Sequence, residues 1–435
     1  MKYRTALFVV LVLLLLLAGC QKEENPINVA SQPTEPEPTA TYDWMAGESP
    51  VSVKRIGVAR RDGLRSTAAI SPTGVYFLYE VLRVYGQTPP SPVILYWDHG
   101  SDTVIRLCGR ADCPHDTEDC NAYVDGGDGL TYYNGYLYVL SDDADGSSND
   151  KNCKLLRMDP DGTNRVQLYD FGEFAREHDA DYARIQRITE GYLNFYICKW
   201  TLTDSGMLKA QPVETYIYKL DGSEGEPRVL KSDGSIIDNC GEVTLAYSAI
   251  SQNGGEYGSY WDWDPATDTL TYLADHPGVP GWFGKDQAFY FKDGAVRRLT
   301  YATGEEEVVI ETGLEGTYYP ICLPDCIIVV SNKIGEHSDP NLHIYNWAFE
   351  LVDTIEVNYR FTETSMVSDA VMTETADRIY LTDMGIYALP AYYIDKSELG
   401  TGNARIHEMD LSDIEYLRES YKPFYPNLFP EYAQE

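Results

Sequence analysis

Basic residues are scarce in this sequence. Its 435 residues include 34 Lys and Arg against 68 Asp and Glu, and the formal net charge is −34 at pH 7. A surface of this charge repels the phosphates of nucleic acids and of anionic lipids. The composition therefore argues against nucleic acid as a partner, and its ordinary consequence is solubility.

Recognisable catalytic motifs are also missing. The sequence has no G-x-S-x-G elbow, no H-E-x-x-H pair, no phosphate-binding glycine loop and no dinucleotide fingerprint. The acidic run Glu305–Glu307 is typical of a solvated turn. The two carboxylates of a glycosidase need proximity in space and not in sequence, so a glycan hydrolase or lyase stays open. No enzyme class is indicated, and the expectation leans towards a protein without catalysis.

The first 20 residues have the charge and hydropathy pattern of an export signal. Lys2 and Arg4 precede an apolar segment over residues 6–17, and Leu17-Ala18-Gly19-Cys20 follows. This pattern predicts a signal peptide over residues 1–19, too short to span a bilayer by itself. The last four residues resemble a bacterial lipobox, which implies cleavage before Cys20 and acylation of its thiol. We therefore expect a bacterial cell-surface protein, anchored in the membrane through Cys20.

Residues 20–50 are expected to form a disordered tether. Residues 21–50 contain five Pro and five Glu with few apolar side chains, a composition that favours an extended chain. The remaining residues, 51–435, exceed the usual size of one domain, so two domains or a repeat architecture are expected.

The stretch from Leu155 to Tyr169 predicts a β-hairpin. Leu156 and Met158 alternate with Arg157, and the same period of two follows the turn. The residues Asp159-Pro160-Asp161-Gly162 supply that turn, because proline fixes a negative φ and glycine accepts a φ that other residues resist. Asn134-Gly135, between two alternating runs, is a second strong hairpin signal.

Six further units follow the same pattern, with no helical runs between them. Each unit has room for four strands, which predicts an all-β fold and a β-propeller of seven four-stranded blades over residues 51–435. Six or eight blades would require one miscounted unit, and two β-sandwich domains are the alternative fold. The outer turns are expected near Asp98, Asp159, Asp221, Asp264, Tyr301, Ala348 and Asp410.

Other segments have less regular patterns. Residues 51–59 read as a lone strand that completes the last unit. Short helices are expected over residues 173–187 and 412–419. The aromatic C-terminal tail from Ser420 to Tyr432 is expected to pack on the outside of the propeller.

Three cysteines and one histidine lie within 13 residues. Cys108, Cys113, His115 and Cys120 have the spacing C-x4-C-x-H-x4-C. This is a donor set for one structural zinc ion, because Cys3His fills a tetrahedron and leaves no position for a catalytic water. A disulfide within the same loop is equally open, since export favours oxidation. Under either alternative these four residues have a structural role, which is to hold together the long loop between units one and two.

Five other cysteines lie beyond this loop. Cys322 and Cys326 flank the turn Pro324-Asp325, so a disulfide between them is a further candidate. Cys198 lies in an aromatic strand and is expected to be a small buried apolar residue.

Two family resemblances follow from these motifs. The turn Asp159-Pro160-Asp161-Gly162-Thr163-Asn164 resembles the repeat of TolB-like secreted propellers, and Leu220–Ser223 carries it in part. The lipobox, the Pro/Glu tether and the early Cys/His cluster together resemble propeller lipoproteins of anaerobic Firmicutes. These resemblances imply a propeller fold and a location at the cell surface, and they do not indicate a catalysed reaction.

Three functions remain after these exclusions. The first is a tethered propeller that binds a ligand or an envelope protein, with an extracellular glycan or peptide among the candidates. The second is an assembly scaffold without a small ligand. The third is an extracellular glycan hydrolase or lyase that uses acids and tyrosines at the central funnel. The 35 Tyr could stack on sugars, although tyrosine is also a good strand former.

Overall fold

The structure is a computed structural model, and it describes part of the chain. The described residues are 46–51, 68–79, 93–101, 103–110, 112–115, 117, 119–124, 127–142, 153–189, 191–203, 206–231, 235–240, 242–249, 258–275, 279–314, 318–331, 341–356, 371–382, 391–410 and 412. The predicted signal peptide, Cys20 and the C-terminal tail lie outside these ranges. Within them, none of the helices has the length and apolar character needed to cross a bilayer.

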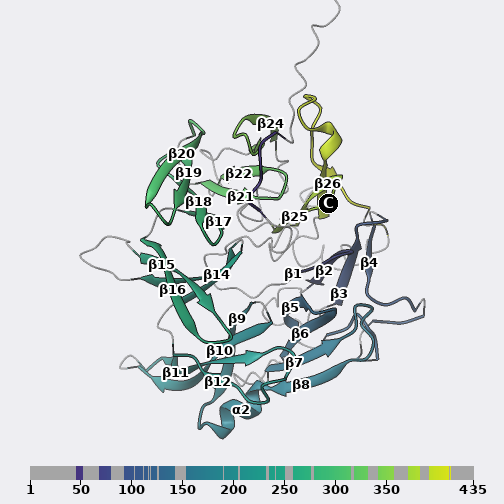
Figure 1. Cartoon of the computed structure of the whole chain (residues 1–435). Helices are drawn as coiled ribbons and strands as arrows, with labels where there is room; N and C mark the ends of the chain where they lie inside the picture. Colours follow the sequence, from purple (N-terminus) through teal and green to yellow (C-terminus); the bar gives the residue numbers. More distant parts are fainter. Residues whose placement is uncertain are drawn as a thin grey trace, which may run out of the picture. The chain divides into compact units, whose positions relative to one another are not determined.

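The described residues form seven four-stranded antiparallel sheets, which are named A to G in chain order (Figure 1). Sheet A consists of β1 (Ala68–Ser71), β2 (Gly74–Tyr79), β3 (Val93–Asp98) and β4 (Thr103–Arg106), and sheet B of β5 (Gly127–Tyr133), β6 (Tyr136–Asp142), β7 (Cys153–Met158) and β8 (Val166–Asp170). Sheet C consists of β9 (Tyr182–Thr189), β10 (Tyr192–Leu202), β11 (Leu208–Lys219) and β12 (Arg228–Val229), and sheet D of β13 (Ser235–Cys240), β14 (Val243–Ala249), β15 (Gly258–Asp264) and β16 (Thr269–Asp275). Sheet E consists of β17 (Val279–Phe283), β18 (Gln287–Lys292), β19 (Ala295–Thr300) and β20 (Glu305–Glu311), sheet F of β21 (Tyr318–Cys322), β22 (Ile327–Ser331), β23 (Asn341–Tyr345) and β24 (Leu351–Glu356), and sheet G of β25 (Val371–Glu374), β26 (Arg378–Thr382), β27 (Ala391–Asp395) and β28 (His407–Glu408).

The hairpin predicted over residues 155–169 is the outer pair of sheet B, β7 and β8. Its turn is held by its own polar side chains. Asp161 Oδ1 accepts hydrogen bonds from the backbone and the hydroxyl of Thr163, at 2.9 and 2.6 Å. Asn164 donates to Asp159 at 2.6 Å, and Gly162 has the positive φ that the turn requires. These side chains therefore serve the turn.

The hydrophobic core is divided into layers that lie between successive sheets. Six clusters of buried side chains join A with B, B with C, C with D, D with E, E with F, and F with G. The cluster between A and B also contains Tyr380 and Met409, which belong to sheet G and the residues after it. Each sheet is thus covered on both faces by its neighbours, as in a propeller.

Contacts between the last and the first sheet complete this series. The ring of Tyr380 lies edge-on to Trp97, with 4.6 Å between centroids, and is stacked on His99 at 4.3 Å. The backbone N–H of Val104 donates to the carbonyl oxygen of Asp410 at 3.2 Å. Sheet G therefore packs against sheet A through side chains, and the chain that follows β28 pairs with β4 through its backbone.

The outer turn of the last unit lies elsewhere than predicted. It was expected near Asp410, but β27 and β28 are joined by residues 396–406, which begin with the 3-10 helix η2 (Lys396–Glu398). Asp395 caps η2 by accepting from the N–H of Ser397 at 2.8 Å, so the chain turns there. Asp410 instead follows β28 and contacts sheet A.

One further local prediction needs correction. The helix expected over residues 173–187 is shorter: α2 spans Phe171–Glu177, and β9 takes the following residues because they pair with β10. Asp170 begins α2 by accepting from the N–H of Glu173 at 2.8 Å. Of the lone strand expected over residues 51–59, the structure describes only Val51, which is buried between sheets E and F, and the other residues lie outside the described ranges.

Candidate metal centre

The loop between β4 and β5 is folded back onto sheet A. The N–H of Leu107 donates to the carbonyl oxygen of Ile94 at 2.9 Å. The N–H of Ile94 donates in turn to the carbonyl oxygen of Ala122 at 2.7 Å. Tyr123 forms an antiparallel bridge with Val93. Both ends of the loop are therefore fixed beside the start of β3, which brings Cys108 and Cys120 towards each other.

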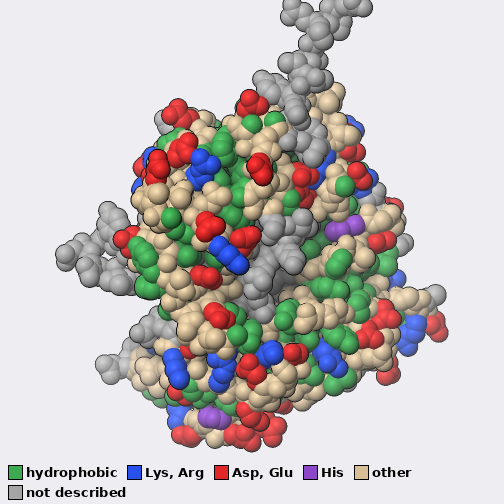
Figure 2. All heavy atoms as spheres, viewed as in Figure 1, with side chains coloured by type: hydrophobic (Ala, Val, Ile, Leu, Met, Phe, Trp, Pro, Cys, Tyr) green, Lys and Arg blue, Asp and Glu red, His purple; other side chains and the backbone are tan. Residues whose placement is uncertain are grey.

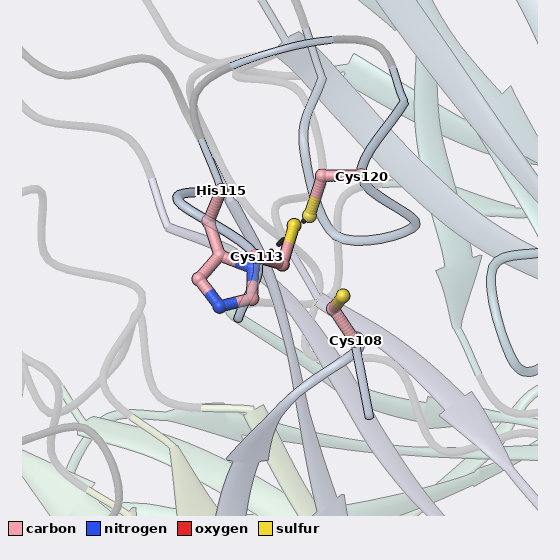
Figure 3. A group of neighbouring side chains, drawn as sticks. All are labelled: Cys108, Cys113, His115 and Cys120. Carbon is pink, nitrogen blue, oxygen red and sulfur yellow. Dashed lines mark hydrogen bonds between the residues drawn. The ribbon is translucent and has the colours of Figure 1, made fainter. Parts of the chain in front are cut away.

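The four predicted ligands converge in this loop (Figure 3). The donor atoms of Cys108, Cys113, His115 and Cys120 all lie within 4.8 Å of one another. Nδ1 of His115 is 3.1 Å from Sγ of Cys120. His115 and Cys120 are buried, whereas Cys108 and Cys113 are half-buried. The sequence pattern thus identified a real cluster.

Tight turns within the loop produce this convergence. The N–H of Cys113 donates to the carbonyl oxygen of Arg110 at 3.3 Å, and the N–H of Cys120 donates to the carbonyl oxygen of Thr117 at 2.9 Å. His115 has a φ of 60°, a left-handed conformation that is uncommon for a residue with a side chain. Such conformations persist where the surroundings hold them, and they concentrate at functional sites.

Arg110 places a positive charge next to two of the thiols, those of Cys108 and Cys113. Its Nη2 is 3.2 Å from Sγ of Cys113 and 2.5 Å from the carbonyl oxygen of Asp119. Burial raises the pKa of Cys108, but hydrogen bonds from the backbone and side chain of Arg110 outweigh it and lower the pKa to about 7. Burial raises the pKa of Cys120 to about 11. The loop thus favours a thiolate at Cys108 before any metal is bound.

The donor set fits one zinc ion. Three sulfurs and one imidazole nitrogen are the ligands of a closed tetrahedral zinc site. Within the described ranges, this is the one group of three or more Cys, His, Asp or Glu side chains placed to hold a metal. A closed site of this kind stabilises a loop and leaves no open position for a reacting water.

Seven cysteines carry separate thiols in this structure: Cys108, Cys113, Cys120, Cys153, Cys198, Cys322 and Cys326. Cys322 packs between sheets E and F, whereas Cys326 packs between sheets F and G, so the two side chains enter different core layers. Cys198 is buried in the aromatic strand β10, as expected for a small apolar residue.

Two arginines that support the loop were not foreseen. Arg110 lies within the cluster motif, so its charge beside three cysteines was a signal that could have been used. Arg165 follows the turn of sheet B, and its Nη2 donates to the carbonyl oxygens of Cys120 and Asn121 at 3.4 and 3.1 Å. Nothing in the sequence indicates that contact, because it joins segments about 45 residues apart.

Four-stranded antiparallel sheets in series, with core layers between successive sheets, define the chain as a β-propeller. No family model and no curated protein match it. Oligogalacturonate lyase in complex with manganese matches 61% of this chain and 73% of its own, with 9% identity and a TM-score of 0.38. The β-propeller domain of the Trilobed protease from Pyrococcus furiosus matches 61% of this chain and 81% of its own, with 12% identity and a TM-score of 0.36. This chain also spans 57% of puromycin hydrolase, which covers 84% of this chain with 14% identity and a TM-score of 0.37. At these identities and TM-scores the likenesses carry no argument about this chain, and the propeller assignment rests on its own sheets and core layers.

Proposed function

We propose that this protein is a surface-tethered β-propeller that binds an envelope protein and catalyses no reaction. The supporting observation is an asymmetry of the connections between strands. First and second strands are joined by two to four residues in every sheet. Second and third strands are joined by much longer segments in five sheets, over residues 80–92, 143–152, 250–257, 332–340 and 383–390. Because strand direction alternates, the second strand of each sheet ends, and the third begins, at the same end of the sheet. Binding residues concentrate on long connections between strands.

The described part of that end includes an exposed apolar hairpin tip. β10 and β11 extend beyond β9, whose pairing stops at Cys198. At the tip, Leu202 is 72% exposed and Met207 is 66% exposed. Neighbouring exposed apolar side chains of this kind favour a protein partner. They offer no aromatic face to a sugar and no charge to a phosphate.

Binding is tested with variants that remove exposed apolar side chains at opposite ends of the sheets. The double variant Leu202→Ser, Met207→Ser removes the apolar tip, and Leu351→Ser removes a 46% exposed side chain that follows a turn at the opposite end of sheet F. We expect pull-down from a cell-envelope extract to lose the same defined partner in the double variant and to keep it in the control. Equal retention in both variants, or turnover of an envelope polysaccharide by the wild type, would contradict the proposal.

The anchor and the surroundings are part of the proposal. A lipid at Cys20 would hold the propeller at the membrane, and the residues that follow would separate it from the bilayer. Asp and Glu side chains are spread over the visible face of the described residues, with Lys and Arg between them (Figure 2). A net negative surface next to anionic lipids favours attachment through the acyl chains alone. Loss of membrane fractionation in Cys20→Ser is the expected result.

We also propose that Cys108, Cys113, His115 and Cys120 hold one structural zinc ion. Their donor atoms already lie within 4.8 Å of one another, so little rearrangement is needed to surround one ion. Metal analysis of protein purified with reductant should give one zinc per chain, and Cys113→Ser should lose it. No zinc, together with a mass lower by two hydrogens per bridge, would favour the disulfide alternative instead.

A further inference from the structure

Sheets F and G meet at a cluster of a buried amine, a buried carboxylate and a partly exposed carboxylate. Lys396, the first residue of η2, has a side chain that is 2% exposed. Its Nζ lies 2.5 Å from Oδ2 of Asp325 and 2.8 Å from Oε2 of Glu374. The same Nζ donates to the carbonyl oxygen of Thr375 at 2.7 Å. A primary amine, a carboxyl group in contact with it and a second carboxylate therefore share one site.

We propose that Lys396 and Asp325 form an intramolecular amide bond, with Glu374 as the proton carrier. Nζ of Lys396 bonds to Cγ of Asp325, the bond from Cγ to one carboxylate oxygen breaks, and that oxygen leaves as water. Two protons of the ammonium group leave with the oxygen, and the third stays on the amide nitrogen. The ammonium and the carboxylate supply every atom and electron, so no oxidant, reductant or other reactant takes part.

Glu374 is placed to move the protons. Its side chain is 5% exposed, and its Oε1 accepts from the backbone N–H of Asp325 at 2.9 Å, which directs Oε2 towards Nζ. Burial raises the pKa of Glu374, so this carboxyl group can hold a proton between the amine and the leaving oxygen. Burial lowers the pKa of Lys396, but the two carboxylates raise it overall, so the amine attacks only as its proton passes to Glu374.

The surroundings favour the amide over the ion pair. Burying the ammonium group of Lys396 carries a desolvation penalty, and the amide removes that charge from the interior. Holding the two groups in contact gives the reaction the advantage of proximity. The side chain of Asp325 is 28% exposed, so the water that leaves has a route to solvent. The bond would join the turn between β21 and β22 to η2, and thus staple sheet F to sheet G.

Peptide mass analysis of the full chain tests the proposal. After trypsin digestion we expect residues 299–333 linked to residues 379–405, at the summed mass of the two peptides less one water, and uncut after Lys396. Lys396→Arg keeps the positive charge and should give only unlinked peptides, as should Glu374→Gln. Lys292→Arg is the control, because this exposed lysine lies beside Glu306 and should leave the linked peptide unchanged.

Unlinked peptides alone in the folded wild type would overturn the proposal. A linked peptide that persists in Glu374→Gln would overturn the role given to Glu374. Circular dichroism of each variant shows whether it is folded, and the wild-type digest decides the question even if a variant is not. The result is independent of envelope binding, so failure of one proposal leaves the other standing.

Discussion

Arg165 donates a 3.1 Å hydrogen bond from Nη2 to the backbone carbonyl oxygen of Asn121. In return, the side-chain amide of Asn121 donates to the carbonyl oxygen of Asp161 at 3.2 Å. Asn121 directly follows Cys120, and Asp161 and Arg165 belong to the outer turn of sheet B. The candidate metal centre is therefore held against sheet B as well as sheet A, and its loop joins the two sheets.

The contact between the outer turn of sheet B and the metal-centre loop is tested by comparing alanine substitutions at two glycines. Gly162 has a φ of 79°, and a Cβ added to it would lie 2.7 Å from the carbonyl oxygen of Asn121. Gly135 has a φ of 84° with nothing within 4 Å of such a Cβ. Gly135→Ala should cost about 1–2 kcal/mol for the backbone conformation alone. Gly162→Ala should cost about 1–3 kcal/mol more because of overpacking, measured by urea unfolding. Equal losses would show that the turn does not touch the loop.

The thiols of the metal-free, reduced protein should differ in reactivity. A lowered pKa increases the thiolate fraction at a given pH, and Cys108 has a pKa of about 7. Its alkylation by iodoacetamide should therefore reach half of its maximal rate near pH 7. Cys120, with a pKa of about 11, should react only in strongly alkaline solution. Arg110→Ala should move the Cys108 midpoint upwards, and peptide mapping identifies the modified residue. An unchanged midpoint would remove the role given to Arg110.

Packing between the last and first sheets should contribute strongly to stability. Tyr380 is 1% exposed and contacts both Trp97 and His99. Tyr380→Ala should lower the free energy of unfolding by about 3–5 kcal/mol, because it leaves a cavity between sheets A and G. The control is Tyr272→Ala, since Tyr272 is 50% exposed, and its cost should be about 1 kcal/mol or less. Similar costs for the two variants would contradict the packing of sheet G on sheet A.

The repeated hairpins could be predicted because their signals are local. Alternation of apolar residues and the turn Asp159–Asn164 fix β7 and β8 without help from the rest of the chain. The Cys/His cluster could be predicted for the same reason, since its four residues lie in one short loop. In both cases the chemistry and the geometry come from neighbouring positions in the sequence.

Features that depend on distant contacts could not be predicted. The sequence around Asp410 resembles that of another hairpin turn. In the structure, however, the backbone of Asp410 forms a bridge with Thr103 of sheet A. The helix expected over residues 173–187 ends at Glu177, and pairing with β10 makes residues 182–189 a strand. The cluster of Lys396, Asp325 and Glu374 brings together residues up to 71 positions apart, so no spacing in the sequence indicates it.

Cobalt substitution tests the metal centre most directly, because Co²⁺ reports the number and type of its ligands through its visible spectrum. Reduced, metal-free wild-type protein should bind one Co²⁺ per chain and develop the intense bands of a tetrahedral site with three thiolates and one imidazole. Added Zn²⁺ should abolish these bands, and Cys120→Ser should fail to produce them. Weak bands of octahedral Co²⁺, or an identical spectrum from Cys120→Ser, would contradict the assignment of Cys108, Cys113, His115 and Cys120 as the ligands.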